Sequence, residues 1–346
     1  MSAVLNDTQA RSGFRLNFVF ITDPLTALEP AHDTTVALME AAQLAGHRVL
    51  TTTIGEIGID QGHAFAHCRD VTLRPAVLGE NKWIADTDWY TCGSTRRYSL
   101  DEVAAIFMRT DPPVDSNYLR ATFILDLVDP SKTLLINSPA GLRDANEKLF
   151  ALQMPELGPP TLVSANRDEI VEAVRTWGAA VLKPTDGMAG RGIMLLRPDD
   201  PNLHSILDTA TARGDQHVVI QKYIVEAKTA GDRRVIVLDG KPIGSVRRIV
   251  DSGGGDEFRC NMATGARVLP DTVTAHDREI CNILGPELIR RGLVFVGIDI
   301  IGDRLTEVNV TSPTGIREID ALSGTHLAAD TIEWATARCT QMTEMR

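Results

Sequence analysis

The sequence predicts an α/β protein in which an N-terminal open sheet is followed by a larger α+β part. Near the N-terminus, two apolar segments typical of strands, residues 16–21 and 48–54, flank a segment typical of a helix. This order indicates a βαβ unit with parallel strands. Towards the C-terminus, turns of two or three residues join the apolar segments, which indicates antiparallel hairpins. A chain of 346 residues can form two or three compact units, each with its own core.

The first βαβ unit has recognisable boundaries. Leu16–Ile21 is apolar and ends at Thr22–Pro24, which predicts a buried strand followed by a turn. Asp33 suits the N-cap of a helix that we expect to run to about Leu44 and to end at Gly46.

Two further buried strands complete the predicted N-terminal domain. Ala104–Met108 is one of them, and the loop Arg109–Pro113 follows at its carboxyl end, where ligands of open α/β sheets tend to bind. Thr133–Asn137 is the other, and Ser138-Pro139 separates it from the next part. We therefore expect this domain to cover residues 15–140.

The second part begins with a predicted helix over Leu142–Gln153. The next predicted elements are a helix over Arg167–Trp177, strands over Ala179–Pro184 and Ile193–Leu196, and a strand, a helix and a strand within residues 203–250. Asp239-Gly240 predicts a tight turn between antiparallel strands.

Composition limits the class of protein. The hydrophobic content of 43% and the charged content of 23% are ordinary for a soluble globular protein. A net charge of −11 argues against nucleic acid as the main partner. No apolar run is long enough to cross a membrane. Residues 1–13 are polar and lack an apolar stretch, which predicts a disordered tail over residues 1–14 rather than a secretory signal. Five scattered cysteines without a C-x-x-C pair indicate reduced thiols in a cytoplasm.

A predicted hairpin near the C-terminus carries three oxygen-bearing side chains. Two apolar runs, residues 296–301 and 305–310, flank Gly302-Asp303-Arg304. With a three-residue loop, Asp299 falls opposite Glu307, and Asn309 shares their face. Hard oxygen ligands of this kind suit Mg²⁺. The alternative is a solvated edge or a paired carboxylate.

A glycine-rich loop joins two predicted strands. Lys183 ends the first strand, and Gly187, Gly190 and Gly192 precede the second. Glycines let a backbone approach phosphate oxygens closely, and Lys183 supplies a positive charge. A plain hairpin loop would have the same pattern.

Two other segments each have two interpretations. Lys148 has helical spacing within residues 146–150, so it lies either on a solvated helix face or at a binding site. Gln221–Ile224 follows an apolar strand and could contact an adenine edge, or could simply end that strand.

Basic residues cluster within one β-rich stretch of this acidic chain. They are Arg233, Arg234, Arg247, Arg248 and Arg259. Guanidinium groups bind carboxylate and phosphate through two hydrogen bonds, which favours a site for a polycarboxylate substrate.

In chain order, these motifs closely resemble the prokaryotic glutathione synthetase family of ATP-grasp ligases. The matching segments are residues 146–150, 182–190, 231–235, 257–261 and 299–314. The resemblance runs from about Leu16 to Gly324, and residues 307–314 combined with Lys148 and Lys183 are specific to the family. The segment Ser312–Asp320 is most similar to the cyanobacterial form.

The resemblance implies a fold and a reaction. An N-terminal pre-ATP-grasp domain would precede an ATP-grasp domain over residues 141–338, with a lid lobe at about 150–225 and a C-terminal lobe at about 226–338. The implied reaction joins glycine to γ-glutamylcysteine with ATP, through an acyl phosphate, in a cytoplasmic homotetramer that needs Mg²⁺ or Mn²⁺. The alternatives are an ATP-grasp ligase for other peptides or amines, and a non-catalytic nucleotide-binding regulatory protein.

The resemblance also implies site residues. Those that would hold ATP are Lys148, Lys183, Gly187, Met188, Gly190, Gly192, Gln221, Lys222, Tyr223, Ile224 and Asp232, with residues 187–192 as a lid. Those that would hold the metal are Asp299, Glu307 and Asn309. Those that would surround the peptide carboxylate and the transferred phosphate are Arg234, Arg248, Arg259, Asn261, Ser312 and Thr314.

The chain departs from the family pattern at Cys260, where the family has glycine. A side chain next to the expected substrate site either alters the fit or points away from it. Because Gly253–Gly255 gives the neighbouring backbone freedom, we expect Cys260 to be harmless.

Overall fold

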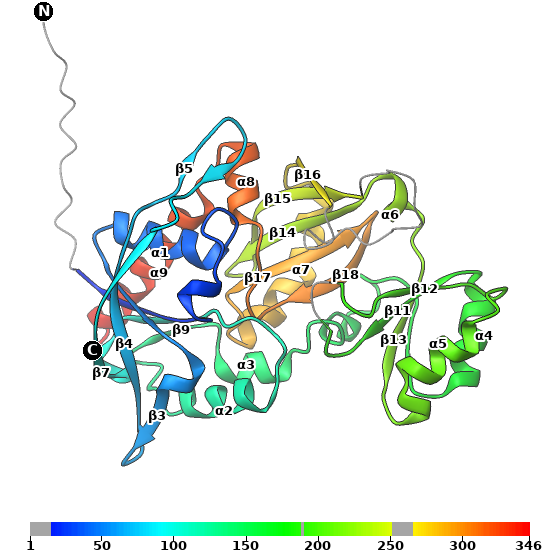
Figure 1. The fold of residues 1–346 in the computed structure, drawn as a ribbon, viewed down its shortest axis with the longest axis horizontal. Coiled ribbons are helices and arrows are strands. Elements are labelled where there is room, and N and C mark those ends of the chain that lie inside the picture. Colours follow the sequence, from blue (N-terminus) through cyan, green and yellow to red (C-terminus); the bar gives the residue numbers. More distant parts are fainter. Residues whose placement is uncertain (1–14, 188–189, 251–265) are drawn as a thin grey trace, which may run out of the picture.

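The computed structural model describes residues 15–187, 190–250 and 266–346. The predicted tail, three of the predicted site residues (Met188, Arg259 and Asn261) and Cys260 lie outside these ranges. Figure 1 shows three sheets side by side, coloured from blue near the N-terminus to red near the C-terminus.

The predicted βαβ unit is confirmed. Strand β1 (Asn17–Ile21) pairs in parallel with β2 (Arg48–Thr52) and with β8 (Ala105–Met108), and β8 pairs in parallel with β9 (Leu134–Ile136). Between β1 and β2, helix α1 (Thr34–Leu44) begins where the Asp33 carboxylate accepts hydrogen bonds from the backbone of the first turn.

The N-terminal sheet is mixed, because three strands that the sequence analysis missed extend it in antiparallel fashion. They are β3 (Ile57–Asp60), β4 (His63–Leu73) and β7 (Tyr90–Ser99). In the sequence, a small separate hairpin of β5 (Val77–Leu78) and β6 (Trp83–Ile84) comes between β4 and β7, which pair directly with each other.

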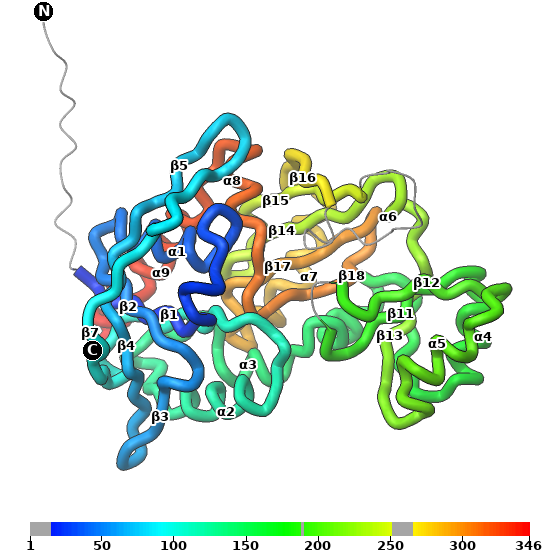
Figure 2. The backbone as a smooth tube through the Cα atoms, in the orientation of Figure 1, coloured from blue at the N-terminus to red at the C-terminus, as the bar shows by residue number. Residues whose placement is uncertain are grey.

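Helices from both ends of the chain pack on this sheet. Besides α1, they are α2 (Ser116–Leu125) and the C-terminal α9 (Leu327–Glu344). Helix α9 lies against α1, as Figure 2 shows, and the Cys339 thiol lies 3.2 Å from the Ala104 carbonyl oxygen. The last helix therefore belongs to the same core as the first strands.

The helix predicted over Leu142–Gln153 is interrupted. Helix α3 (Pro139–Asp144) ends early, and a short 3₁₀ turn follows at Phe150–Gln153. Between them, the Asn146 side chain accepts hydrogen bonds from the amides of Lys148 and Leu149, which replaces helical bonds with an Asx turn.

A second, four-stranded antiparallel sheet carries its own core. Its order is β10 (Thr161–Ser164), β13 (Val218–Lys222), β11 (Ala180–Pro184) and β12 (Met194–Leu196). Helices α4 (Arg167–Trp177) and α5 (Leu203–Ala210) supply apolar side chains to that core. The stretch after residue 203 thus begins with a helix, not with the predicted strand.

The third sheet is antiparallel and five-stranded. Its order is β16 (Arg267–Pro270), β15 (Lys241–Ile249), β14 (Asp232–Leu238), β17 (Phe295–Ile301) and β18 (Arg304–Asn309). The predicted turn at Asp239-Gly240 is confirmed, and both residues have the positive φ values of a tight hairpin turn, 49° and 75°.

The two faces of this third sheet have different neighbours. Helix α7 (Ala275–Arg290) contributes Ile280 and Leu284 to the core that contains Val235 and Ile298. Helix α8 (Ile316–Ser323) packs with side chains of the opposite face, such as Ile236. Side chains alternate along a strand, so Asp232, Arg234 and Asp299 share the face that α8 only partly covers.

The remaining helices are short. They are α6 (Glu226–Thr229) and the 3₁₀ turns at Leu25–Ala27, Ile54–Glu56, Leu100–Glu102 and Ala212–Gly214. Across the described ranges, the helices are too short or too polar to traverse a bilayer.

The predicted hairpin of β17 and β18 forms with a different loop. Ile301 pairs with Arg304, so the turn contains only Gly302-Asp303 and the three-residue loop was wrong. A bulge near Thr306 adds one residue to β18, and Asp299 still lies opposite Glu307. The loop and the bulge therefore compensate for each other, and the predicted pairing is confirmed.

Candidate active site

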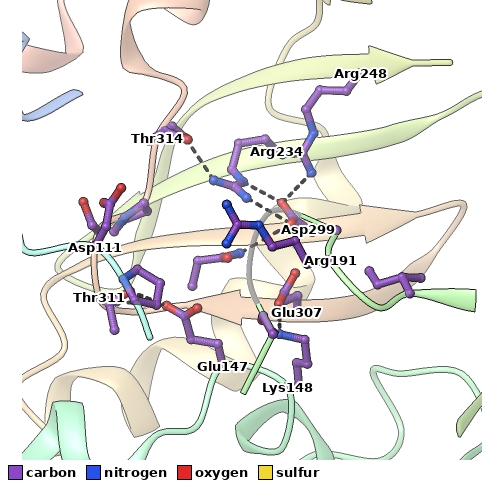
Figure 3. A pocket seen from close by; sticks show the side chains of 17 residues that line it. Asp111, Glu147, Lys148, Arg191, Arg234, Arg248, Asp299, Glu307, Thr311 and Thr314 are labelled. Atoms are coloured by element: carbon purple, nitrogen blue, oxygen red, sulfur yellow. Dashed lines mark hydrogen bonds and ion pairs between the residues drawn. The ribbon is translucent and has the colours of Figure 1, made fainter. Parts of the chain in front are cut away.

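A row of alternating charges crosses the third sheet. Strand register sets Asp232 opposite Arg248, and Arg234 opposite Asp299. The Arg248 guanidinium donates to both oxygens of Asp232 at 2.7 and 2.6 Å, and Arg234 donates to both oxygens of Asp299 at 2.6 and 3.0 Å. Arg248 also lies 3.0 Å from Asp299, and Figure 3 shows Asp299 between Arg234 and Arg248. This contact joins the two pairs into one network.

These four side chains are buried, so their charges interact strongly. Burial alone would raise the pKa of Asp299, but Arg234 and Arg248 outweigh it and hold that pKa below its usual range. Asp299 is therefore ionised, and its two oxygens are already engaged by guanidinium groups.

Lys148 is buried beside Glu307. It is only 6% exposed, which excludes the solvated helix face. Its Nζ lies 3.2 Å from Glu307 Oε1 and donates to the carbonyl oxygen of Gly187 in the glycine loop. Lys148 can reach Glu307 because the helix is interrupted. Residues 145–149 instead lie against β18, where the backbone amide of Val308 donates a hydrogen bond to the backbone carbonyl oxygen of Glu147.

Lys183 approaches the same carboxylate from the second sheet. Its Nζ donates to the Thr306 carbonyl oxygen at 3.5 Å. Burial lowers the pKa of Lys183, and the charge of Glu307 opposes that shift. A bound anion would favour the charged form of this lysine.

A first cavity, of about 240 Å³, opens over this region (Figure 3). The predicted site residues that line it are Lys148, Gly187, Gly190, Arg234, Arg248, Asp299, Glu307, Asn309, Ser312 and Thr314. Arg191 of the glycine loop also lines it, although the sequence analysis did not single it out.

Glu147 is a second lining residue that the sequence analysis missed. Its Oε1 accepts hydrogen bonds from the amides of Val310 and Thr311 and from the Thr311 hydroxyl, at 2.8, 3.0 and 2.8 Å. Burial, and next the charge of Glu307, raise the pKa of Glu147. Its position directly before Lys148 was the available signal.

The N-terminal domain supplies another wall of the first cavity. Asp111, from the loop after β8, lines it beside Ser312. Arg109 donates to the carbonyl oxygen of Pro313 at 2.9 Å, and Arg234 donates to that of Thr314 at 3.0 Å. The loop 311–315 is thus held between the two domains.

A second cavity, of about 80 Å³, lies between the second and third sheets. It is lined by Lys183, Gln221, Lys222, Tyr223, Ile224 and Asp232, all predicted for ATP, together with apolar residues such as Val181 and Ile301. Both carboxylate oxygens of Asp232, which the family resemblance assigns to the ribose of ATP, accept hydrogen bonds from Arg248. Ile193, Asp299 and Glu307 line both cavities, so the two adjoin.

Gly192 closes the glycine loop against β11. Its φ is 71°, and a Cβ there would lie 2.7 Å from the Pro184 side chain. A glycine is therefore required by both conformation and space. Gly192 is the one predicted loop glycine that lines neither of these two cavities.

The overall fold is similar to that of two solved synthetases. A D-cycloserine synthetase superposes with a TM-score of 0.62 at 14% identity, covering 93% of this chain and 99% of the other. D-alanyl-alanine synthetase A from Vibrio cholerae superposes with a TM-score of 0.59 at 12% identity, covering 94% and 98%. These superpositions show the shared fold, and the match of residues 147–324 to an ATP-grasp domain model makes the chain an ATP-grasp ligase.

Sequence comparison gives the family. The model of the prokaryotic glutathione synthetase N-terminal domain matches residues 16–143, and the model of its ATP-grasp domain matches residues 147–324. The glutathione synthetase of Thermosynechococcus vestitus is 50% identical over 92% of this chain and 99% of its own, and that of Synechocystis sp. is 49% identical over 92% and 98%. The chain belongs to the prokaryotic glutathione synthetase family.

Proposed function

We propose that this chain ligates glycine to γ-glutamylcysteine with ATP, giving glutathione, ADP and phosphate. The observation that carries the proposal is the convergence of Lys148, Lys183 and Glu307 where the two cavities adjoin. A nucleotide in the second cavity would direct its phosphates to this point, and the peptide would meet them from the first cavity.

ATP would use the second cavity for its base. The apolar walls suit the faces of adenine, and the segment Gln221–Ile224 offers backbone groups to its edge. Lys148 and Lys183 would then neutralise the phosphates as point charges, and the backbone of Gly187 and Gly190 would cover them.

The donor set fits Mg²⁺ or Mn²⁺. Glu307 has a carboxylate that faces both cavities, and Asn309 donates through its nitrogen to Gly297, which leaves its amide oxygen as an acceptor. Among the residues described, no cluster of three or more His, Cys, Asp or Glu could enclose a metal. A nucleotide-bound Mg²⁺ needs few protein ligands, so we assign Glu307 and Asn309 as direct ligands and Asp299 as a ligand through water. When bound, the metal would draw charge from the phosphate oxygens.

The chemistry needs positioning more than a covalent nucleophile. An oxygen of the donor carboxylate attacks the γ-phosphorus of ATP, and the bond from that phosphorus to the oxygen bridging the β- and γ-phosphates breaks. ADP departs, and the donor becomes an acyl phosphate. The ammonium group of glycine loses a proton, the resulting amine attacks the acyl carbon, and phosphate departs as the new amide nitrogen loses a second proton. Arg234 and Arg248 would stabilise the negative oxygens in both steps, held in place by Asp299 and Asp232.

The decisive experiment measures ADP release with γ-glutamylcysteine, with and without glycine. We expect release that depends on both substrates and stops without a divalent metal. Release with another amine in place of glycine would identify a ligase of different specificity. Nucleotide binding without turnover under any of these conditions would favour a regulatory protein and would refute the proposal.

Three further assignments belong to the same proposal. We place the enzyme in the cytoplasm, because its scattered cysteines without a C-x-x-C pair are typical of reduced thiols, and as a homotetramer, because the family resemblance suggests it. We divide the chain at residue 140 into an N-terminal domain and an ATP-grasp domain over 141–338. Size measurement in solution tests the tetramer.

A further inference from the structure

The loop 311–315 joins β18 to α8, and its residues Thr311, Ser312, Pro313 and Thr314 line the first cavity. None of these residues lines the second cavity, where ATP would place its base. The position of the loop therefore matters to the first of these two cavities and not to the second. Side chains that hold the loop can act on one substrate without acting on the other.

Helix α1 of the N-terminal domain is linked to the second half of this loop. Arg109 bridges the two, because it donates to the Thr35 hydroxyl at 3.1 Å and to the Pro313 carbonyl oxygen at 2.9 Å. The amide of Ile316, the first residue of α8, donates to the Thr34 hydroxyl at 3.4 Å. The start of α8 is thus fixed to the start of α1.

A buried ion pair makes a further link between α1 and α8. Arg317 is 3% exposed and Glu40 is 4% exposed, and Nη2 of Arg317 donates to Oε2 of Glu40 at 2.7 Å. The other oxygen of Glu40 accepts a hydrogen bond of 3.0 Å from the amide of Ala76. Desolvation offsets much of the attraction within a buried ion pair, so a pair of this kind can be kept for the position it imposes.

The small hairpin of β5 and β6 covers the same arginine. Nε1 of Trp83 donates to the carbonyl oxygen of Arg317 at 2.7 Å, and the guanidinium carbon of Arg317 lies 4.6 Å from the centre of the Trp83 ring. Figure 1 shows β5 beside α8. The other strand residues of the hairpin, Val77, Leu78 and Ile84, are exposed. The hairpin strands therefore add little to a core, apart from the side chain that holds Arg317.

We infer that Glu40, Arg317 and Trp83 are positioning residues for the ligation, and that they hold the loop 311–315 where the peptide donor and the transferred phosphate need it. The inference rests on the proposed function. None of the three residues lines the first cavity, so they act through the loop.

The loop also helps to orient a guanidinium of the site. Arg234 donates to the carbonyl oxygen of Thr314 at 3.0 Å, as Figure 3 shows. A shifted loop would displace this acceptor together with the polar groups of the loop itself. Binding of the peptide in the first cavity would weaken, whereas binding of ATP in the second cavity would not.

Steady-state kinetics of Trp83→Phe tests the inference. Phenylalanine keeps an aromatic ring over Arg317 but removes the N–H group that holds its carbonyl oxygen, and the exposed hairpin allows the change without a loss of core packing. We expect the KM for γ-glutamylcysteine to rise about fivefold, the effect of one lost hydrogen bond, and the KM for ATP to stay within about twofold. A role in stability alone would move neither KM.

Trp334→Phe is the matched control. Trp334 of α9 is also half-buried, and its Nε1 donates to Asp239 at 3.3 Å, outside the first and second cavities. This variant loses the same kind of hydrogen bond and should leave both KM values unchanged.

Two substitutions of Arg317 test the ion pair. Lysine still supplies a positive charge for Glu40, whereas methionine supplies none. Arg317→Met should raise the KM for γ-glutamylcysteine about tenfold or more, and Arg317→Lys should restore part of that loss, with the KM for ATP unchanged in both. Trp83→Phe decides the test if Arg317→Met does not fold.

The outcomes separate the inference from the proposed function. If the parent ligates γ-glutamylcysteine and Trp83→Phe leaves its KM unchanged, or raises both KM values alike, the three residues do not position the loop. If the parent ligates no γ-glutamylcysteine at all, the proposed function itself is wrong, and this result is seen before any variant is made.

Discussion

Replacing Asp299 with asparagine tests the charge network at its centre. Asparagine keeps the shape of the side chain and one acceptor oxygen, but it removes the negative charge between Arg234 and Arg248. Arg248 retains Asp232, whereas Arg234 loses its only ion-pair partner within the described ranges. A buried charge left without its partner costs about 3–5 kcal/mol, so we expect Asp299→Asn to lower the free energy of unfolding by about that amount.

Urea unfolding, followed by circular dichroism, measures the change. Asp303→Asn is the matched control, because Asp303 lies in the turn of the same hairpin, is 70% exposed and, among the described residues, forms an ion pair only with Arg304. Exposed pairs contribute about 0–1 kcal/mol, so the control should unfold almost like the parent. If Asp299→Asn also stays within about 1 kcal/mol of the parent, the network does not stabilise the fold and the reasoning is refuted.

The stability difference between the parent and Asp299→Asn should depend on pH. The folded pKa of Asp299 lies below its unfolded value of about 3.9, so its contribution is complete above that value and is lost as the pH falls towards the folded pKa. The difference in stability between the parent and Asp299→Asn should therefore be constant near neutrality and shrink under acid conditions. A difference that grows as the pH falls would contradict the assignment.

Three other predictions concern activity. Glu307→Ala should lower turnover by about 100-fold or more while circular dichroism stays unchanged, because a metal ligand is lost, and an unaltered Mg²⁺ requirement would contradict that role. Arg191 is exposed and lines the first cavity, so bound ATP with Mg²⁺ should protect the chain from tryptic cleavage after Arg191. Unchanged cleavage with saturating nucleotide would contradict a loop that closes over ATP. Cys260→Gly should keep activity within about threefold and leave peroxide sensitivity unchanged, whereas a peroxide-resistant variant of a sensitive parent would reveal a reactive thiol.

Local signals predicted the parts of the fold that depend on local chemistry. Asp33 caps α1 as expected, and Asp239-Gly240 forms the expected turn, because capping and turn formation involve neighbouring residues. Strand β7 was missed because it is exposed along most of its length and therefore lacks the apolar alternation of a buried strand. The helix over 142–153 failed because the Asn146 side chain competes for the backbone amides.

The site was predictable as a set of residues but not as a set of contacts. The pairing of Asp299 with Glu307 follows from strand alternation, which survives a change of loop when a bulge restores the register. The bonds from Arg234 to Asp299 depend on β14 and β17 being neighbours in the sheet, and no local pattern reports that. Glu147 lies within the family-like segment 146–150, yet its bonds to Val310 and Thr311 span more than 160 residues.

The position of α9 has a consequence for synthesis of the chain. Its Leu327 and Ile332 complete a core that also contains Phe18 and Val36, so the first strands to leave the ribosome are covered by one of the last helices to be made. Until residues 327–344 emerge, one face of α1 stays open to water and to other nascent chains. We therefore expect the N-terminal half to depend on chaperones during translation, and ribosome-bound chains that stop before residue 327 to remain sensitive to protease in residues 15–140.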